Sequence, residues 1–142
     1  MQARPITDDL SIGPQLAMAD IAEAKAAGFH SIVVNRPDGE GGPDQPDFAD
    51  IEAAAAKAGI ETRYIPVTVG NIADADIEAF AAAMKDMPKP ILAFCKSGTR
   101  AAMLWALSQA DQRPLPEILR LGSDAGCDLS SLSSRITQRS AT

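Results

Sequence analysis

Short apolar, β-branched runs alternate along this chain with alanine-rich stretches of helical length, and this alternation limits the fold more than any other feature. The expected strands are 10–12, 31–35, 61–67 and 91–94, and the expected helices occupy 20–27, 47–58, 77–84 and 101–107. This order is typical of a parallel sheet wound with crossover helices. Because the chain has 26 alanines and six aromatic residues, its helices must be thin and lie close to the sheet. We predict an α/β fold with a mainly parallel central sheet of four to five strands flanked by helices.

A length of 142 residues fits one compact domain, so we expect a single domain over 1–142. Pro116 opens a predicted short helix, and the serine-rich sequence after Asp128 predicts a tail that is loosely ordered from about residue 133. The segment 36–46 holds three glycines and three prolines, which predicts a loop. A loop of this length at the carboxyl end of a parallel strand is often functional.

Charge and composition exclude several classes of function. Thirteen basic and nineteen acidic residues give a net charge of −6, which argues against binding to nucleic acid or to an anionic membrane surface. The first nine residues lack the apolar core of a signal peptide, and no window approaches the apolar length of a spanning helix, so we expect a cytoplasmic protein. With one histidine and two distant cysteines, the sequence predicts no metal site, no cofactor and no Cys–His catalytic pair.

The chemistry concentrates in the sequence CKSGTR, which joins the most apolar strand to a helix. Cys95 is expected to lie among the unpaired N–H groups of the turn and of the first helical residues, which favour a thiolate. The anion-binding residues are expected to be Lys96, Ser97, Gly98, Thr99 and Arg100. The glycine lets successive N–H groups converge on one anion, and the arginine guanidinium can bind two of its oxygens. The turn therefore predicts a nucleophile inside an anion-binding loop.

Several other residues leave two interpretations open. A lone cysteine at a strand end can simply fill the core, but the glycine, arginine and helix start that follow Cys95 favour catalysis. Cys127 fits a packing residue, with a resolving cysteine opposite Cys95 as the alternative. In the long loop, Arg36 would bind the anion and Asp38 would donate a proton, or the two would form a salt bridge that holds the loop. His30 precedes a strand at the opposite edge and is expected to be a surface or packing residue.

The chain resembles the phosphatase-like domain family of the beta-lactamase hydrolase-like proteins, which is similar in fold to dual-specificity phosphatases. The resemblance runs from about Ile6 to Leu132 and rests on four segments in order: DDLSIGPQL, GFHSIVVNRPDGE, YIPVTVGNI and ILAFCKSGTRAAMLWAL. It implies a cysteine-phosphatase-like three-layer sandwich, with Cys95 as nucleophile and Arg100 as anion binder in a P-loop. Members of this family also occur fused to persulfide dioxygenase or rhodanese-type modules, and some are called sulfur transferases.

The sequence departs from the phosphatase pattern around the turn. Four residues separate Cys95 from Arg100 where phosphatases have five, and this shorter spacing is similar to that of the rhodanese loop, which accepts sulfane sulfur. Ala101 replaces the Ser or Thr that helps the cysteine leave, and Phe94 replaces the preceding His. Val69 stands where dual-specificity phosphatases have their general-acid Asp. Without a general acid, hydrolysis of an unactivated alkyl phosphate loses a factor of about 10²–10⁴.

These departures favour sulfur transfer over phosphoryl transfer, because a thiolate that attacks sulfane sulfur expels a group that leaves unprotonated. The leading hypothesis is a sulfurtransferase that forms a persulfide on Cys95. Its expected partners are a small anionic sulfane-sulfur donor and a persulfide-oxidising enzyme. One alternative is a phosphomonoester hydrolase that forms a phosphocysteine at Cys95 and uses Asp38 as a substitute acid. Another is a noncatalytic oxyanion-binding module.

Overall fold

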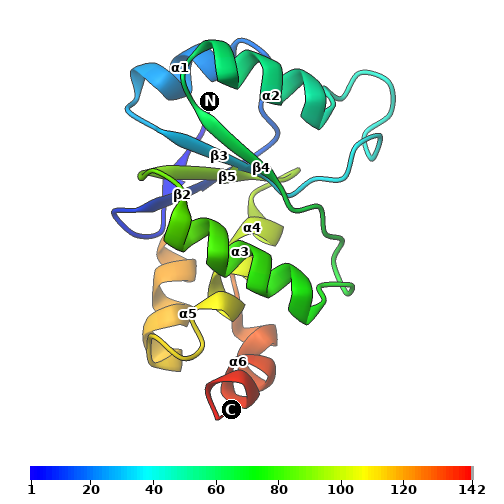
Figure 1. The fold of residues 1–142 in the computed structure, drawn as a ribbon. Helices are drawn as coiled ribbons and strands as arrows, with labels where there is room; N and C mark the ends of the chain where they lie inside the picture. The colour runs from blue at the N-terminus through cyan, green and yellow to red at the C-terminus, as the bar shows by residue number, and fades with distance from the viewer. Residues whose placement is uncertain (142) are drawn as a thin grey trace.

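The computed structural model describes residues 1–141. Its elements in chain order are β1 (Arg4–Pro5), β2 (Leu10–Gly13), α1 (Asp20–Ala26), β3 (Ser31–Val34), α2 (Phe48–Lys57), β4 (Glu61–Tyr64), α3 (Asp74–Asp86), β5 (Ile91–Phe94), α4 (Thr99–Ser108), α5 (Leu115–Asp124), the 3₁₀ helix η1 (Ser130–Leu132) and α6 (Ser133–Ser140). Helices α1 and α2 cover one face of the central sheet, and α3 and α4 cover the other, with α5 and α6 beyond them (Figure 1). This arrangement confirms the predicted three-layer α/β sandwich.

The sheet has five strands in the order β1-β2-β5-β3-β4. Strands β2, β5, β3 and β4 run parallel, and only β1 pairs antiparallel, with β2. The predicted mainly parallel sheet is therefore confirmed, with β5 in its centre. The sequence did not predict β1, because a strand of two residues is too short to show an alternating pattern of apolar side chains. Strand β4 ends at Tyr64 and not at Val67 as predicted, although the N–H of Ile65 and the N–H of Val67 still donate to the end of β3.

The central strands are apolar throughout because both of their faces are covered by helices. All four residues of β5 are buried. Ile91 and Ala93 belong to the core cluster that includes α3 and α4, whereas Leu92 and Phe94 belong to the cluster under α1 and α2. Side chains that alternate along β5 therefore pack into two separate cores, one on each face of the sheet.

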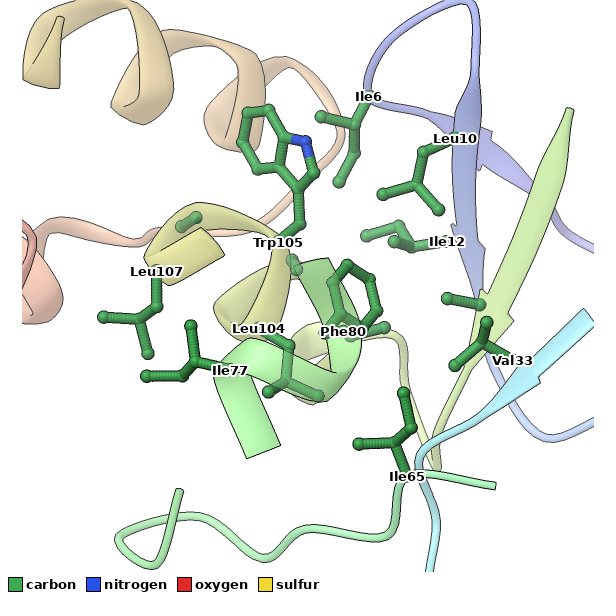
Figure 2. Close-up of a cluster of buried hydrophobic side chains, with 14 of the residues drawn as sticks. Ile6, Leu10, Ile12, Val33, Ile65, Ile77, Phe80, Leu104, Trp105 and Leu107 are labelled. Atoms are coloured by element: carbon green, nitrogen blue, oxygen red, sulfur yellow. The ribbon is translucent and has the colours of Figure 1, made fainter. Parts of the chain in front are cut away.

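The larger core lies between the sheet and helices α3 and α4. Figure 2 shows Phe80 and Trp105 among the strand residues Leu10 and Ile12. Both rings are at most 1% exposed. Large rings at these two positions fill the space that the many alanines of the helices leave open.

Residues 133–140 form helix α6, which corrects the prediction of a loosely ordered tail from about residue 133. Ile136 is 1% exposed and joins the larger core. Arg135 and Arg139 each form an ion pair with Asp74 at the start of α3, at 3.2 and 3.1 Å. One buried apolar side chain and two long cations thus fix a helix whose composition is otherwise polar. In the described part of the chain, no helix is long and apolar enough to cross a membrane.

Candidate active site

Cys95 is the first residue after the central strand β5, and its side chain lies at the start of α4. The residue is 1% exposed. Its backbone N–H donates to the carbonyl of Gly13, which fixes the turn against the end of β2. The N–H of Gly98 donates to the Cys95 Sγ over 3.0 Å. An N–H aimed at the sulfur from a helix N-terminus stabilises negative charge on it, as a nucleophilic thiolate requires.

Gly98 is the N-cap of α4, and its φ of +98° is in the left-handed region. A Cβ on this residue would also lie 2.5 Å from Arg4 Nη2. That same Arg4 nitrogen donates to the Ser97 carbonyl at 2.7 Å. Gly98 therefore supplies the backbone conformation of the turn, and a side chain in its place would displace the end of Arg4, which braces the turn from outside.

Arg100 lies in the first turn of α4 and is 8% exposed. Its Nη1 and Nη2 donate to the two carboxylate oxygens of Glu40 at 2.6 and 2.7 Å. Nη1 also donates to the Val67 carbonyl at 3.1 Å. These three bonds fix the far end of the guanidinium against the long loop and against the segment after β4. Arg100 thus has a single defined orientation beside the turn.

Glu40 also accepts a hydrogen bond from Arg36, so the three side chains form a chain of charges. The Arg36 Nε donates to Glu40 Oε1 at 2.9 Å, and its Nη1 donates to Gln15 Oε1 at 3.2 Å. Hydrogen bonds from Arg100, opposed by partial burial and reinforced by Arg36, lower the pKa of Glu40 from 4.5 to about 2. The Glu40 carboxylate is therefore ionised at neutral pH.

Arg100 also interacts with the Cys95 sulfur. The pKa of Arg100 is raised, first by its hydrogen bonds to Glu40 and then, against partial burial, by its interaction with Cys95, which includes a hydrogen bond to the sulfur. The guanidinium thus lies between the Glu40 carboxylate on the long loop and the Cys95 sulfur on the turn. The predicted nucleophile and the predicted anion binder are together.

Asp38, the predicted proton donor, is engaged in other contacts. Its Oδ1 accepts the N–H of Phe48 at 2.8 Å at the start of α2, and its own N–H donates to the Tyr64 hydroxyl at 2.9 Å. The carboxylate of Asp38 therefore satisfies a backbone N–H in the first turn of α2. The salt bridge that was the alternative for this loop does exist, but Arg36 makes it with Glu40.

The remaining predicted residues of the turn have distinct surroundings. Lys96 is exposed, and its carbonyl accepts the N–H of Gln15. Ser97 donates through its hydroxyl to the hydroxyl of Thr99 at 3.2 Å. Cys127 is buried, and burial raises the pKa of its thiol, while Arg4 and a hydrogen bond with Thr99 oppose that rise. His30 is exposed at the amino-terminal edge of the sheet, as predicted.

Three residues of the site were not singled out from the sequence. Glu40 stands four positions after Arg36. This spacing predicts an ion pair on a helix, but the segment was predicted to be a loop. Arg4 and Gln15 come from the N-terminal region and reach the site only through the pairing of β1 and β2 with the rest of the sheet. No local pattern marks them. Among residues 1–141, no group of three or more His, Cys, Asp and Glu side chains is placed to hold a metal ion.

Residues 2–112 match the family model described as beta-lactamase hydrolase-like protein, phosphatase-like domain. A beta-lactamase hydrolase-like protein of Agrobacterium fabrum (strain C58 / ATCC 33970) is 38% identical over an alignment of 143 positions, which covers 99% of this chain and 33% of the relative. One from Xylella fastidiosa (strain Temecula1 / ATCC 700964) is 37% identical over 131 residues, which cover 91% of this chain and 30% of the relative. The chain thus spans about a third of the length of these relatives.

Solved structures share the whole fold. A candidate phosphatase from Neisseria meningitidis z2491 superposes with a TM-score of 0.84 at 34% identity, covering 96% of each chain. The core catalytic domain of the PP-IP phosphatase SIW14 from S. cerevisiae superposes with a TM-score of 0.68 at 13% identity, covering 96% of this chain and 83% of that one. The second likeness shows the fold alone. Together they confirm the predicted cysteine-phosphatase-like architecture.

Proposed function

Because the chain belongs to the phosphatase-like domain family of the beta-lactamase hydrolase-like proteins, we propose that it is a cysteine-dependent phosphatase. The observation that carries the proposal is the Gly98 N–H bond to the Cys95 sulfur beside the Arg100 guanidinium. We rank phosphoryl transfer ahead of the sulfur transfer that the sequence favoured, because the phosphatase-like relatives support that order.

The reaction follows from the placement of these groups. The turn N–H groups and Arg100 bind the phosphoryl oxygens, and the Cys95 thiolate attacks phosphorus. The bond between phosphorus and the leaving oxygen breaks, and its electron pair departs with the leaving group. Water then attacks phosphorus, the S–P bond breaks, and phosphate and the thiolate are released. Both steps are displacements and need no oxidant or cofactor.

The test is Cys95-dependent release of phosphate from an aryl phosphate. We expect turnover by the wild type, none by Cys95→Ser, and a loss of roughly 10²-fold or more in Arg100→Lys, since lysine lacks the planar fork. Cys127→Ser is the matched control, because it removes the other buried thiol, and it should keep its activity. Equal turnover by wild type and Cys95→Ser would overturn the proposal.

Sulfur transfer is the second candidate, and the four-residue spacing between Cys95 and Arg100 favours it. In that reaction the thiolate attacks a sulfane sulfur, and the sulfur–sulfur bond of the donor breaks with release of sulfite or a thiolate. Incubation with thiosulfate or glutathione persulfide would then add one sulfur to the wild type and none to Cys95→Ser. Cyanide should remove that sulfur as thiocyanate. A noncatalytic oxyanion module would show neither adduct nor turnover while still binding phosphate through Arg100.

A further inference from the structure

We propose that the Arg36–Glu40–Arg100 chain sets the substrate class: it turns one edge of Arg100 toward two oxygens of the substrate and supplies no proton to the leaving group. The inference rests on the proposed phosphatase function. The substrates are then activated phosphates, such as aryl phosphates and phosphoanhydrides, whose leaving group departs as an anion. Unactivated alkyl phosphates are excluded as good substrates.

The orientation of Arg100 follows from a count of its donors. A guanidinium has five N–H groups in a planar fork. In the structure both Nη1 hydrogens are used, on Glu40 and on Val67, and one Nη2 hydrogen is used on Glu40. The Nε–H and the second Nη2–H share the other edge of the fork, which is left for the Cys95 sulfur and for a substrate bound over it. A tetrahedral anion presents two oxygens at the spacing that such an edge binds.

Glu40 orients this edge and is itself oriented by Arg36. The contact from Arg36 Nε holds one carboxylate oxygen at 2.9 Å while Arg100 holds both. Gly41 allows this arrangement, because a Cβ there would lie 2.8 Å from Arg36 Nη2. Glu40 is therefore a positioning residue that acts on substrate through Arg100.

The same contacts prevent Glu40 from acting as the acid. A carboxylate that accepts hydrogen bonds from two guanidinium groups is stabilised in its ionised form and carries no proton at neutral pH. Asp38 is turned to the N–H of Phe48. Val69, where related phosphatases would have an aspartate, is 68% exposed and has no proton to give. With none of these three residues able to give a proton, the leaving oxygen departs with its electron pair and takes a proton from solvent afterwards.

A leaving-group series tests this inference. The values of kcat/KM are measured for aryl phosphates of graded phenol acidity, for acetyl phosphate and for glycerol phosphate, using wild type, Glu40→Gln and the control Glu52→Gln. For wild type we expect log kcat/KM to fall by on the order of one unit per unit of leaving-group pKa. Glu40→Gln should lower kcat/KM by roughly 10-fold or more on every substrate with the slope unchanged, because Arg100 is misaligned. Glu52 is exposed on α2, and its variant should match wild type.

The outcomes separate this inference from the proposed function. A shallow slope in wild type that becomes steep in Glu40→Gln would make Glu40 the proton donor and overturn the inference while the phosphatase function stands. Equal rates on glycerol phosphate and on the most acidic aryl phosphate would also overturn it. Absence of any Cys95-dependent turnover across the series would instead refute the proposed function.

Discussion

Single residues decide the charge of the site. Arg100 lies between the Cys95 sulfur and the Glu40 carboxylate, and Arg36 also pairs with Glu40. Cys95 could be predicted as the nucleophile from the sequence, because the turn that follows it is a local pattern. Glu40 could not, because its partner Arg100 is sixty positions away and only the folded sheet brings their ends together.

Glu40 predicts how stability depends on pH. Its pKa is about 2 in the folded protein and near 4.5 ordinarily. Its contribution to the free energy of unfolding is therefore complete above pH 4.5 and is lost as pH falls toward 2. We expect the free energy of unfolding of wild type to be larger than that of Glu40→Gln by on the order of 1 kcal/mol at pH 7, because solvent screens a partly exposed group. This difference should close by pH 2.

Urea unfolding at a series of pH values measures this difference. Glu52→Gln serves as the control, since Glu52 is exposed on α2, and it should parallel wild type throughout. A constant gap between wild type and Glu40→Gln from pH 7 to pH 2 would mean that Glu40 is not held ionised by its two arginines.

At the scale of elements, periodicity predicted the sheet and its order of helices, while short or polar elements were missed. The apolar strands β3 and β5 are visible in sequence because they serve two cores. Strand β1 has two residues, and α6 has one buried residue, so neither shows a period. The same limit applies to the site: the turn belongs to one strand–helix junction, whereas Arg4, Gln15 and Glu40 come from other elements.

The turn between β5 and α4 predicts unequal effects of two glycine substitutions. Gly98 and Gly28 have nearly the same φ, +98° and +96°, but only Gly98 has Arg4 against it. Gly28→Ala should cost roughly 1 kcal/mol of stability through backbone strain and keep full activity. Gly98→Ala should cost more and lose most activity, because Arg4 is displaced and the N–H to Cys95 moves. Melting temperature and phosphate release measure the two effects, and equal losses in both variants would contradict this account.

Helix α6 predicts a large effect from one residue. Ile136 is 1% exposed in the core, so Ile136→Ala should destabilise the protein by about 2–4 kcal/mol. Thr137→Ala, on the exposed side of the same helix, should change stability by less than about 0.5 kcal/mol. Chemical denaturation measures both. A loss of under about 0.5 kcal/mol for Ile136→Ala would instead support the loosely ordered tail that the sequence predicted.

The whole molecule is acidic, with a net charge of −6, yet it gathers arginines at the carboxyl edge of its sheet. Arg4 contacts the turn, Arg100 lies in the first turn of α4, and Arg36 follows β3. A fold that collects strand ends at one edge can thus form a local anion site on an anionic protein.

This local site predicts stabilisation by inorganic phosphate. Binding to the folded state at ten times the dissociation constant adds about 1.4 kcal/mol and raises the melting temperature. We expect this rise in wild type and its loss in Arg100→Ala. Arg113→Ala, which removes a cation paired with Glu117 away from the turn, is the control and should retain it. An equal rise in Arg100→Ala would indicate a general salt effect.

If Cys95 accepts a group from an anionic substrate, intact-mass spectrometry of the acid-quenched protein detects the covalent adduct. Wild type, Cys95→Ser and Cys127→Ser are each mixed with an aryl phosphate and quenched during turnover. We expect a phosphoryl adduct in wild type and in Cys127→Ser and none in Cys95→Ser. Absence of the adduct from all three proteins, or its presence in Cys95→Ser, would contradict it.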